Sequence, residues 1–317
     1  PYRNFLPSIG RLTRYRPPAG EGVRVDAGVF EGSEITVHYD PMIAKLVAHG
    51  PDRDGAADRL GAALDAFEIE GVGHNVDFVA AVAGHPRFRA GRLTTGFIAE
   101  EFPGGFRGRA PGPEEWPALA AVAVFARQRT AERDAAISGQ LPGRRHRPAN
   151  DWVVRCGDEE APAQATAAGD GMAVRIGDRT LAVESAWAPG MRVWRGTVDG
   201  APVVLRIAAT VDGFRLRRAG ADLRITVLPQ RVAALARLMP VKTAPDVSRF
   251  LLSPMPGLLA SVAVSEGQEV KAGEALAVVE AMKMENVLRA ERDGRIGKIH
   301  AAAGSSLAVD QKILEFE

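Results

Sequence analysis

The spacing of apolar and polar residues predicts a mixture of helices and strands for residues 1–107. Over Asp52–Ile69, apolar residues recur at intervals of three and four, which is the pattern of an amphipathic helix. The segments Arg11–Arg16 and Gly22–Ala27 predict short strands, because Pro and Gly residues bound them. A second helix is expected to start at Asn75, whose side chain can cap it.

Residues 108–239 combine one long apolar helix with a series of short alternating strands. The helix is expected over about Glu114–Ile137, and its centre, Ala118–Ala126, is apolar on every side. Such a helix has to be enclosed all round, since no side of it suits water. The turn pairs Asp199-Gly200 and Asp212-Gly213 separate neighbouring strands, as hairpin turns do. An antiparallel barrel wrapped around the helix satisfies both patterns.

An internal repeat fills the C-terminal region 250–317, which follows a proline-containing linker at 240–249. Residues 247–280 align without a gap to residues 284–317. One unit alone is too small to bury its apolar face, so the two are expected to pack about a pseudo-twofold axis into a flattened β barrel. The equivalent pairs include Gly257 with Gly294, Gly267 with Gly304, Leu259 with Ile296, Val270 with Leu307, and Leu276 with Ile313.

Lys283 lies in the connection between the two repeats, which the alignment limits to Ala281, Met282 and Lys283. A side chain at such a hairpin points into solvent, so an ordinary surface lysine is the simplest interpretation. A catalytic amine needs a lowered pKa, and the nearby Glu280 and Glu285 would act in the opposite direction. An enzyme that brings its own activated acyl group can still modify an exposed amine. Position therefore favours an attachment point over a catalyst.

Composition excludes several classes of protein. The chain has 317 residues, which suggests two or three domains, and its hydrophobic (46%) and charged (25%) contents are typical of a globular protein. Its 40 basic residues balance 39 acidic ones, so no nucleic-acid partner is expected. No apolar run reaches the length of a membrane span, so no membrane association is expected. The histidines show no metal-ligand spacing, and no bound metal is expected.

The single cysteine, Cys156, excludes an internal disulfide and fits a reducing compartment. It alternates with Trp152 and Val154, which favours a buried strand position over a nucleophile. The N-terminal residues have no signal-peptide layout and begin in the middle of a loop-like phrase, without an initiator methionine. We therefore expect the chain to be a piece of a longer protein.

The phrase Ala281-Met-Lys-Met-Glu285, set between two β repeats, resembles the biotinyl domain of biotin-dependent carboxylases. Lipoyl domains share this fold and hairpin, but their lysine usually follows an acidic residue and precedes an alanine. Here Met282 and Met284 flank the lysine, which favours biotin over lipoate. Their flexible thioethers suit the seat of an apolar bicyclic ring, although packing at the strand ends also explains them.

The N-terminal region resembles the C-terminal subdomain of biotin carboxylase. The resemblance lies in Phe5–Leu12, Gly22–Asp26, Tyr39–Leu46 and Gly71–Val76. Together with the helix-and-strand region, the whole chain resembles the C-terminal half of the α subunits of propionyl-CoA carboxylases. The related methylcrotonyl-CoA enzymes have a similar layout, and the phrase that begins at Phe5 favours the propionyl-CoA group.

This resemblance implies an α+β multidomain chain of three folded parts. These are part of a biotin carboxylase domain at 1–107, a subunit-docking domain with a helix wrapped by an antiparallel barrel at 108–239, and an all-β, lipoyl-like biotin carrier at 250–317. A linker at 240–249 joins the last two. The ATP-grasp fold of this ATP-dependent ligase family is expected upstream of residue 1, together with the sites for ATP, Mg and bicarbonate.

The resemblance also implies site residues. Lys283 is the position that carries biotin covalently. Phe5, Tyr39, Asp40 and Lys45 lie in segments that resemble the floor of the biotin pocket, and structural packing explains them as well.

Two basic features are candidates for contact surfaces, the first by resemblance to the family and the second by its charge. Arg24 matches a position at the carboxylase dimer interface, with a strand-edge salt bridge as the alternative. Arg144–Arg147 is basic enough to touch an acidic partner surface, although a solvated loop is the simpler interpretation.

The family's reaction implies partners. ATP and bicarbonate supply a carboxyl group to biotin, and a carboxyltransferase β subunit passes it to propionyl-CoA to give methylmalonyl-CoA. A biotin protein ligase, an acyl-CoA substrate bound by the β subunit, and a large hetero-oligomer of α and β subunits are expected. The implied location is the bacterial cytoplasm, or the mitochondrial matrix of a eukaryote. The alternatives are a carrier and assembly module without catalysis, and a lipoyl-bearing acyltransferase subunit.

Overall fold

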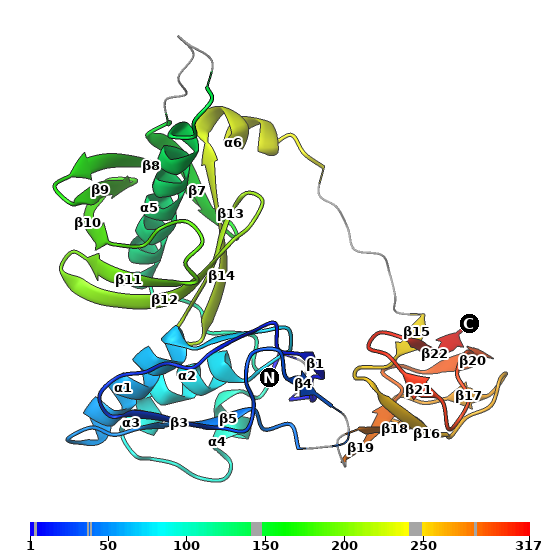
Figure 1. Cartoon of the computed structure of the whole chain (residues 1–317). Coiled ribbons are helices and arrows are strands. Elements are labelled where there is room, and N and C mark those ends of the chain that lie inside the picture. Colours follow the sequence, from blue (N-terminus) through cyan, green and yellow to red (C-terminus); the bar gives the residue numbers. More distant parts are fainter. Residues whose placement is uncertain (3–4, 37, 39, 141–147, 241–248, 282–283) are drawn as a thin grey trace.

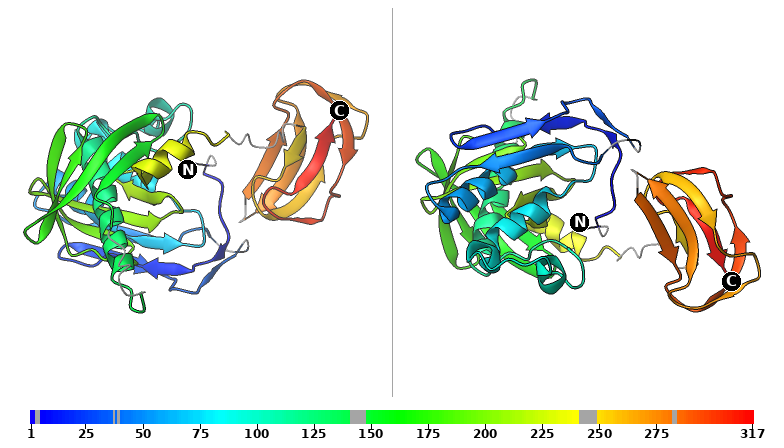
Figure 2. Two further views of the ribbon diagram at one scale, coloured as in Figure 1. Left: turned by 90° about the horizontal axis from the view of Figure 1, so that it is seen from above. Right: turned by 90° about the horizontal axis from the view of Figure 1, so that it is seen from below.

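The chain forms three folded parts in a computed structural model, which describes all residues except 3–4, 37, 39, 141–147, 241–248 and 282–283. A helix-and-strand part from the N-terminus carries a β barrel on one side (Figure 1). A second, flattened β unit at the C-terminus follows residues 241–248. Figure 2 shows the same parts from above and below, with the long helix inside the larger barrel.

The N-terminal part, residues 1–107, is built from short ladders and helices. Its ladders pair β1 with β4, β2 with β6, and β3 with β5. Leu12, Leu64 and Phe67 lie in the core between these ladders and helix α1. The elements are β1 (Gly10–Arg11), β2 (Arg14–Arg16), β3 (Val23–Ala27), β4 (Glu34–Ile35), β5 (Ala44–Ala48), α1 (Arg53–Ala66), β6 (Glu68–Glu70), α2 (Val76–Gly84), α3 (Pro86–Arg89) and α4 (Phe97–Glu101).

Two expectations for this part were wrong in detail. The helix expected over Asp52–Ile69 ends at Ala66, because residues 68–70 form β6 and pair with β2 instead. Asn75 does precede α2, but its side chain makes no capping hydrogen bond and its backbone (ψ 10°) is not extended. An N-cap side chain reaches the helix amides from an extended backbone, which Asn75 lacks.

In the described part of residues 108–239, eight strands close into an antiparallel barrel in the order β10-β11-β12-β13-β14-β7-β8-β9. Helix α5 (Glu115–Ala135) runs through it, and every residue over 119–126 is buried. This confirms the enclosed helix. The remaining elements are β7 (Asp151–Cys156), β8 (Glu159–Ala168), β9 (Gly171–Ile176), β10 (Arg179–Ser185), β11 (Val193–Val198), β12 (Ala201–Ala209), β13 (Gly213–Arg218), β14 (Ala221–Pro229) and α6 (Gln230–Ala236).

The barrel interior is packed with side chains. Phe125 of α5 meets Trp194 edge to face at 6.1 Å between ring centroids. Gln128 is buried but satisfied, because it accepts a hydrogen bond of 3.1 Å from the Trp152 indole. Cys156 is half-buried at the end of β7, less enclosed than Trp152 and Val154 before it.

The C-terminal unit, residues 250–317, is two four-stranded sheets whose order follows the sequence repeat. One sheet has the order β15-β22-β20-β17 and the other β19-β18-β16-β21, so each strand has its repeat equivalent at the same place in the other sheet. Such an exchange is what a pseudo-twofold relation requires. The elements are β15 (Phe250–Leu252), β16 (Gly257–Val262), β17 (Glu269–Val270), β18 (Ala275–Ala281), β19 (Met284–Arg289), β20 (Gly294–Ile299), β21 (Ser306–Leu307) and β22 (Lys312–Phe316).

The repeat pairs occupy equivalent environments. Leu259 and Ile296 are both fully buried, and so are Leu276 and Ile313. The equivalent turn glycines, Gly267 and Gly304, both have φ near +80°, a backbone conformation that favours glycine. The two copies therefore share the same buried positions and the same turns.

Gly257 and Gly294 are equivalent in the repeat but differ in what an added methyl group would meet. At Gly257 a Cβ would lie 2.5 Å from the Glu280 carbonyl oxygen, whereas at Gly294 its nearest neighbour is the Phe316 ring at 3.2 Å. A backbone carbonyl group in a strand cannot move away from an added methyl group as easily as a side chain can. We expect Gly257→Ala to destabilise the carrier by about 1–3 kcal/mol and Gly294→Ala by clearly less.

Amide hydrogen exchange in β18 and β22 measures this difference. All four tryptophans lie within 116–194, so their fluorescence serves as a control that the larger barrel is unchanged. Equal loss of protection in the two variants would contradict the argument.

Candidate functional site

The β18–β19 hairpin carries the sequence phrase singled out above. In its ladder Ala281 pairs with Met284, Glu280 with Glu285, and Val279 with Asn286. Lys283 and Met282 lie outside the described residues. Ala281 was expected in the connection but belongs to strand β18, so only two residues separate the paired strand ends.

The side chains at the end of this ladder differ in exposure. Ala281 is buried (4% exposed), whereas Met284 is 46% exposed. Asn286 contacts the sulfur of the fully buried Met255 at 3.6 Å, which connects β19 to the core beneath it. Glu280 and Glu285 are exposed and directly opposite one another, an arrangement of like charges that a hairpin does not adopt for stability alone.

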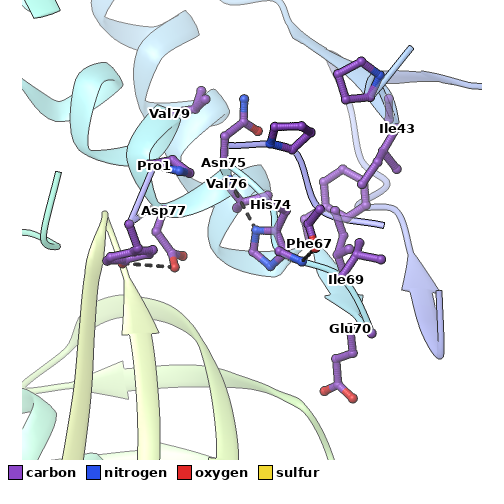
Figure 3. A pocket seen from close by; sticks show the side chains of 18 of the residues that line it. Pro1, Ile43, Phe67, Ile69, Glu70, His74, Asn75, Val76, Asp77 and Val79 are labelled. Carbon is purple, nitrogen blue, oxygen red and sulfur yellow. Dashed lines mark hydrogen bonds between the residues drawn. The ribbon is translucent and has the colours of Figure 1, made fainter. Parts of the chain in front are cut away.

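A cavity of about 1320 Å³ lies where the three folded parts meet. Its walls come from residues 1–2, 5–9, 40–44 and 46, from the β6–α2 region, from barrel strands β12 and β13, and from the carrier. Figure 3 shows the β6–α2 wall of the cavity, which includes Phe67 just before β6, Ile69 on β6 and His74 just before α2. Met284 also lines the cavity, so the exposed end of β19 lies at this space.

His74 lines the cavity as a neutral group. Burial, reinforced by the positive charge of Arg206, lowers its pKa to about 4. Its Nδ1 accepts a hydrogen bond from the Val76 amide at 3.4 Å, which fixes the ring at the start of α2. At neutral pH the ring therefore contributes shape to the cavity, not charge.

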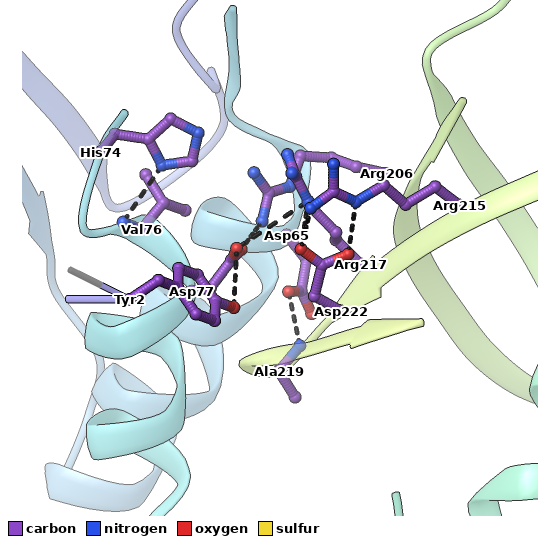
Figure 4. A network of polar contacts seen from close by, with 10 residues as sticks. All are labelled: Tyr2, Asp65, His74, Val76, Asp77, Arg206, Arg215, Arg217, Ala219 and Asp222. Carbon is purple, nitrogen blue, oxygen red and sulfur yellow. Dashed lines mark hydrogen bonds and ion pairs between the residues drawn. The ribbon is translucent and has the colours of Figure 1, made fainter. Parts of the chain in front are cut away.

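A network of charged side chains joins α2 to the barrel (Figure 4). Asp77 of α2 is buried and pairs with Arg206 of β12, and the Tyr2 hydroxyl donates to it at 3.4 Å. Arg217 of β13 lies 3.8 Å from the same carboxylate. Breaking a buried pair leaves an uncompensated charge, which makes such contacts costly to open. We call Tyr2, Asp77, Arg206, Arg215, Arg217 and Asp222 the interdomain ion network.

The barrel side of this network is held by Asp222. Arg215 donates to it through two nitrogens, at 2.6 and 2.5 Å, and Arg217 donates at 3.1 Å. Burial by itself would raise the pKa of Asp222, but the hydrogen bond from Arg215 and the charge of Arg217 outweigh it and lower that pKa. Asp222 therefore stays ionised and orients both arginines towards α2.

The β13–β14 turn inserts between helices α1 and α2. The Ala219 amide donates to Asp65 of α1 at 2.7 Å. Gly220 has φ +82°, and a Cβ there would lie 2.5 Å from the Ala81 side chain and 2.7 Å from the Asp77 carbonyl oxygen. Only glycine fits both the conformation and the space, so this turn sets how closely the barrel approaches the helices.

Of the four residues predicted to line a biotin pocket, two line the cavity in the structure. Phe5 and Asp40 line the cavity together. Lys45 lies on β5 opposite Asp26, with its side chain exposed, and it is not among the lining residues. Tyr39 lies outside the described residues.

Of the two basic features predicted to form contact surfaces, the structure describes only Arg24. Arg24 of β3 bridges Asp26 at 3.1 Å, and its side chain is 70% exposed, so in this chain it makes a strand-edge salt bridge. Arg144–Arg147 lies outside the described residues. Among the residues that the structure describes, no cluster of His, Cys, Asp and Glu could hold a metal ion. Within the same residues, no helix is long and apolar enough to span a membrane.

Comparisons with known proteins match all three folded parts. Residues 1–100 match the biotin carboxylase C-terminal domain, residues 119–242 the propionyl-coenzyme A carboxylase BT domain, and residues 249–316 the biotin-requiring enzyme domain. The chain therefore belongs to the biotin-dependent acyl-CoA carboxylase family.

Within that family the chain is homologous to propionyl-CoA carboxylase alpha chains. It is 48% identical to the one from Ruegeria pomeroyi and 33% identical to the mitochondrial one from Mus musculus, over all of this chain and 50% and 45% of those proteins. The mitochondrial methylcrotonoyl-CoA carboxylase subunit alpha of Mus musculus is 28% identical, over all of this chain and 45% of that protein. The chain spans about half the length of the curated relatives it matches.

Asp65 makes the contact between α1 and the barrel sensitive to pH. Burial raises its pKa to about 6, against the opposing hydrogen bond from Ala219. The raised pKa means that the neutral form is favoured in the folded state. The stability from this group is complete below about pH 4 and is lost as pH rises through about 6.

We expect Asp65→Asn to abolish this loss, because the amide stays neutral and can still accept from Ala219. Relative to the unsubstituted chain, the variant should gain stability between pH 4 and 7 by about 3 kcal/mol. Urea unfolding at a series of pH values measures the difference. The control is Asp54→Asn, on the solvent side of α1, which should show no such trend. A stability difference for Asp65→Asn that does not vary with pH would refute the assignment.

Proposed function

We propose that Lys283 carries covalently bound biotin and that the chain is the carrier-bearing part of a propionyl-CoA carboxylase α subunit. The observation that carries this proposal is the ladder of β18 and β19, paired as far as Ala281 and Met284 with Lys283 between them in the sequence. The match of residues 249–316 to biotin-requiring enzymes supports it.

The described residues around position 283 fit an attached group. Ala281 is buried and closes the core beneath the strand end, so the hairpin has a rigid base. Glu280 and Glu285 favour the protonated form of any nearby amine, which opposes a catalytic base. Attachment needs no lowered pKa, because the modifying enzyme brings the activated acyl group and its own base. The exposed thioether of Met284 offers apolar surface beside the attachment point.

Biotin, when bound, carries a carboxyl group from an ATP- and bicarbonate-dependent site to an acyl-CoA. This chain's part is to hold the carrier near both sites. A carrier that is tethered to the chain has a high effective concentration at both sites, which replaces free diffusion. The sites for ATP, Mg and bicarbonate belong to a biotin carboxylase domain of which residues 1–107 form the C-terminal part.

The proposed partners are a carboxyltransferase β subunit, a biotin protein ligase, and the acyl-CoA that the β subunit binds. The barrel at 108–239 is the proposed β-subunit contact, because residues 119–242 match the BT domain. The proposed assembly is a large hetero-oligomer of α and β subunits. The proposed compartment is the cytoplasm of a bacterium or the mitochondrial matrix of a eukaryote, in keeping with the relatives.

Propionyl-CoA is the proposed acceptor. The two propionyl-CoA carboxylase relatives are 48% and 33% identical to this chain, against 28% for the methylcrotonoyl-CoA subunit. A carrier and assembly module without catalysis is the alternative, and residues 1–107 count against it, because a carrier alone would not need a carboxylase subdomain. A lipoyl carrier is opposed by the methionines on both sides of Lys283.

The attachment site is tested by intact mass after co-expression with a biotin protein ligase. We expect the mass of one biotinyl group on the unsubstituted chain and none on Lys283→Ala. Lys298→Ala, a change to a lysine of the repeat-equivalent sheet, should leave the modification intact. A lipoyl-sized gain, or biotin that persists in Lys283→Ala, would refute the proposal.

The acceptor is tested in a complex reconstituted from the full-length α chain and its β subunit. With ATP and bicarbonate supplied, we expect a higher kcat/KM for carboxylation of propionyl-CoA than of methylcrotonyl-CoA, and no activity with the Lys283→Ala chain. Methylcrotonyl-CoA as the better substrate would overturn the choice of acyl group while leaving the biotin site in place.

A further inference from the structure

Leu6 of the N-terminal part packs against the core of the carrier. It is half-buried, and its apolar neighbours there belong to the carrier, whereas Ile9, three residues later, packs into the core of residues 1–107. The chain therefore changes its packing partner between these two residues. The carrier core that Leu6 contacts consists of Met255, Leu259, Ala277, Val279, Ala281, Ala301, Leu307 and Ile313.

The backbone just before Leu6 is held in a strained conformation. Phe5 has φ +62°, which is uncommon for a residue with a side chain and persists only when its surroundings enforce it. Its ring meets Phe78 of α2 edge to face, at 4.9 Å between centroids. Phe5 is thus fixed to the helix, and the next side chain is presented to the carrier.

The carrier offers a matching apolar face. Pro254, Pro256 and Val309 line the cavity together with Leu6 and Met284. Val309 and Met284 remain 40% and 46% exposed, so they are not needed to close the carrier's own core. This face contains Met284, the described residue next to Lys283, and it is turned towards the cavity.

We propose that Leu6 is a docking contact that seats the carrier, in the same chain, against the carboxylase subdomain with its β18–β19 hairpin at the cavity. This inference rests on the proposed function, because the seat holds the biotin-bearing hairpin at the cavity. The occupant is the carrier of this chain, since it is the one seated on Leu6. Residues 241–248 can span no more than about 30 Å when fully extended, which keeps the carrier within reach of this seat.

The contact is small, so it is expected to be reversible. Leu6 is one side chain, and the apolar surface around it on the carrier is partly open to water. A stable protein interface buries many side chains, whereas this contact depends on one leucine. A seat of this strength holds the carrier part of the time and releases it for a second site.

The test is the tumbling of the carrier, measured by backbone 15N relaxation of residues 250–317 in the whole chain. In the unsubstituted chain the seated fraction should slow the tumbling of the carrier towards that of the barrel. Leu6→Asp should release it and lower its apparent correlation time several-fold. Leu93→Asp is the control, because Leu93 is a leucine of the same part of the chain that is 45% exposed and does not line the cavity.

The carrier side is tested by Val309→Asp, with Val287→Asp as its control, since Val287 is 45% exposed and away from the cavity. This pair also decides the matter if Leu6→Asp fails to fold. Release by Val309→Asp, and by Leu6→Asp where that variant folds, with neither control released, supports the seat. A carrier that tumbles freely in the unsubstituted chain, or that stays docked in Val309→Asp, overturns it. Intact mass keeps the two proposals apart: all variants should still accept biotin at Lys283, and its loss from the unsubstituted chain would count against the proposed function.

Discussion

Pairing of Ala281 with Met284 is the constraint on which the carrier depends. It lets two copies of one β unit share a hairpin only two residues long, with β18 closing one sheet's core and β19 continuing the same ladder. A longer connection would leave the attachment point on a loose loop. A strand register changed by one residue would turn the side chains of β19 to the opposite face. On the proposed function, the paired strand ends on either side of position 283 fix where an attached group starts.

The other two parts are held together by a different interaction. Buried ion pairs between α2 and β12–β13, with the Gly220 turn between the helices, join the barrel to the carboxylase subdomain as one body. The same region contains Asp65, whose burial makes the junction respond to pH. On the proposed function only the carrier has to move, so a firm junction between the other two parts is what that function requires.

The sequence predicted the features that repeat or alternate locally. The carrier's sheets follow from the alignment of two segments, and the helix inside the barrel follows from a stretch that is apolar on all sides. The interdomain ion network could not be predicted, since Asp77 and Arg206 are 129 residues apart and nothing in the sequence pairs them. Strand β6 was taken for helix, because its pairing with β2 overrides the local helical spacing. The contact of Leu6 with the carrier could not be predicted either, because it joins two folded parts whose residues lie far apart in the sequence.

Cross-strand contacts at the end of the β18–β19 ladder test this account most directly. In a nuclear Overhauser spectrum of the labelled chain, we expect close backbone contacts between Ala281 and Met284 and between Val279 and Asn286. Contacts of Ala281 with Glu285 instead would mean a slipped register, a longer connection and reversed side chains in β19. That result would contradict the claim that a two-residue hairpin presents Lys283.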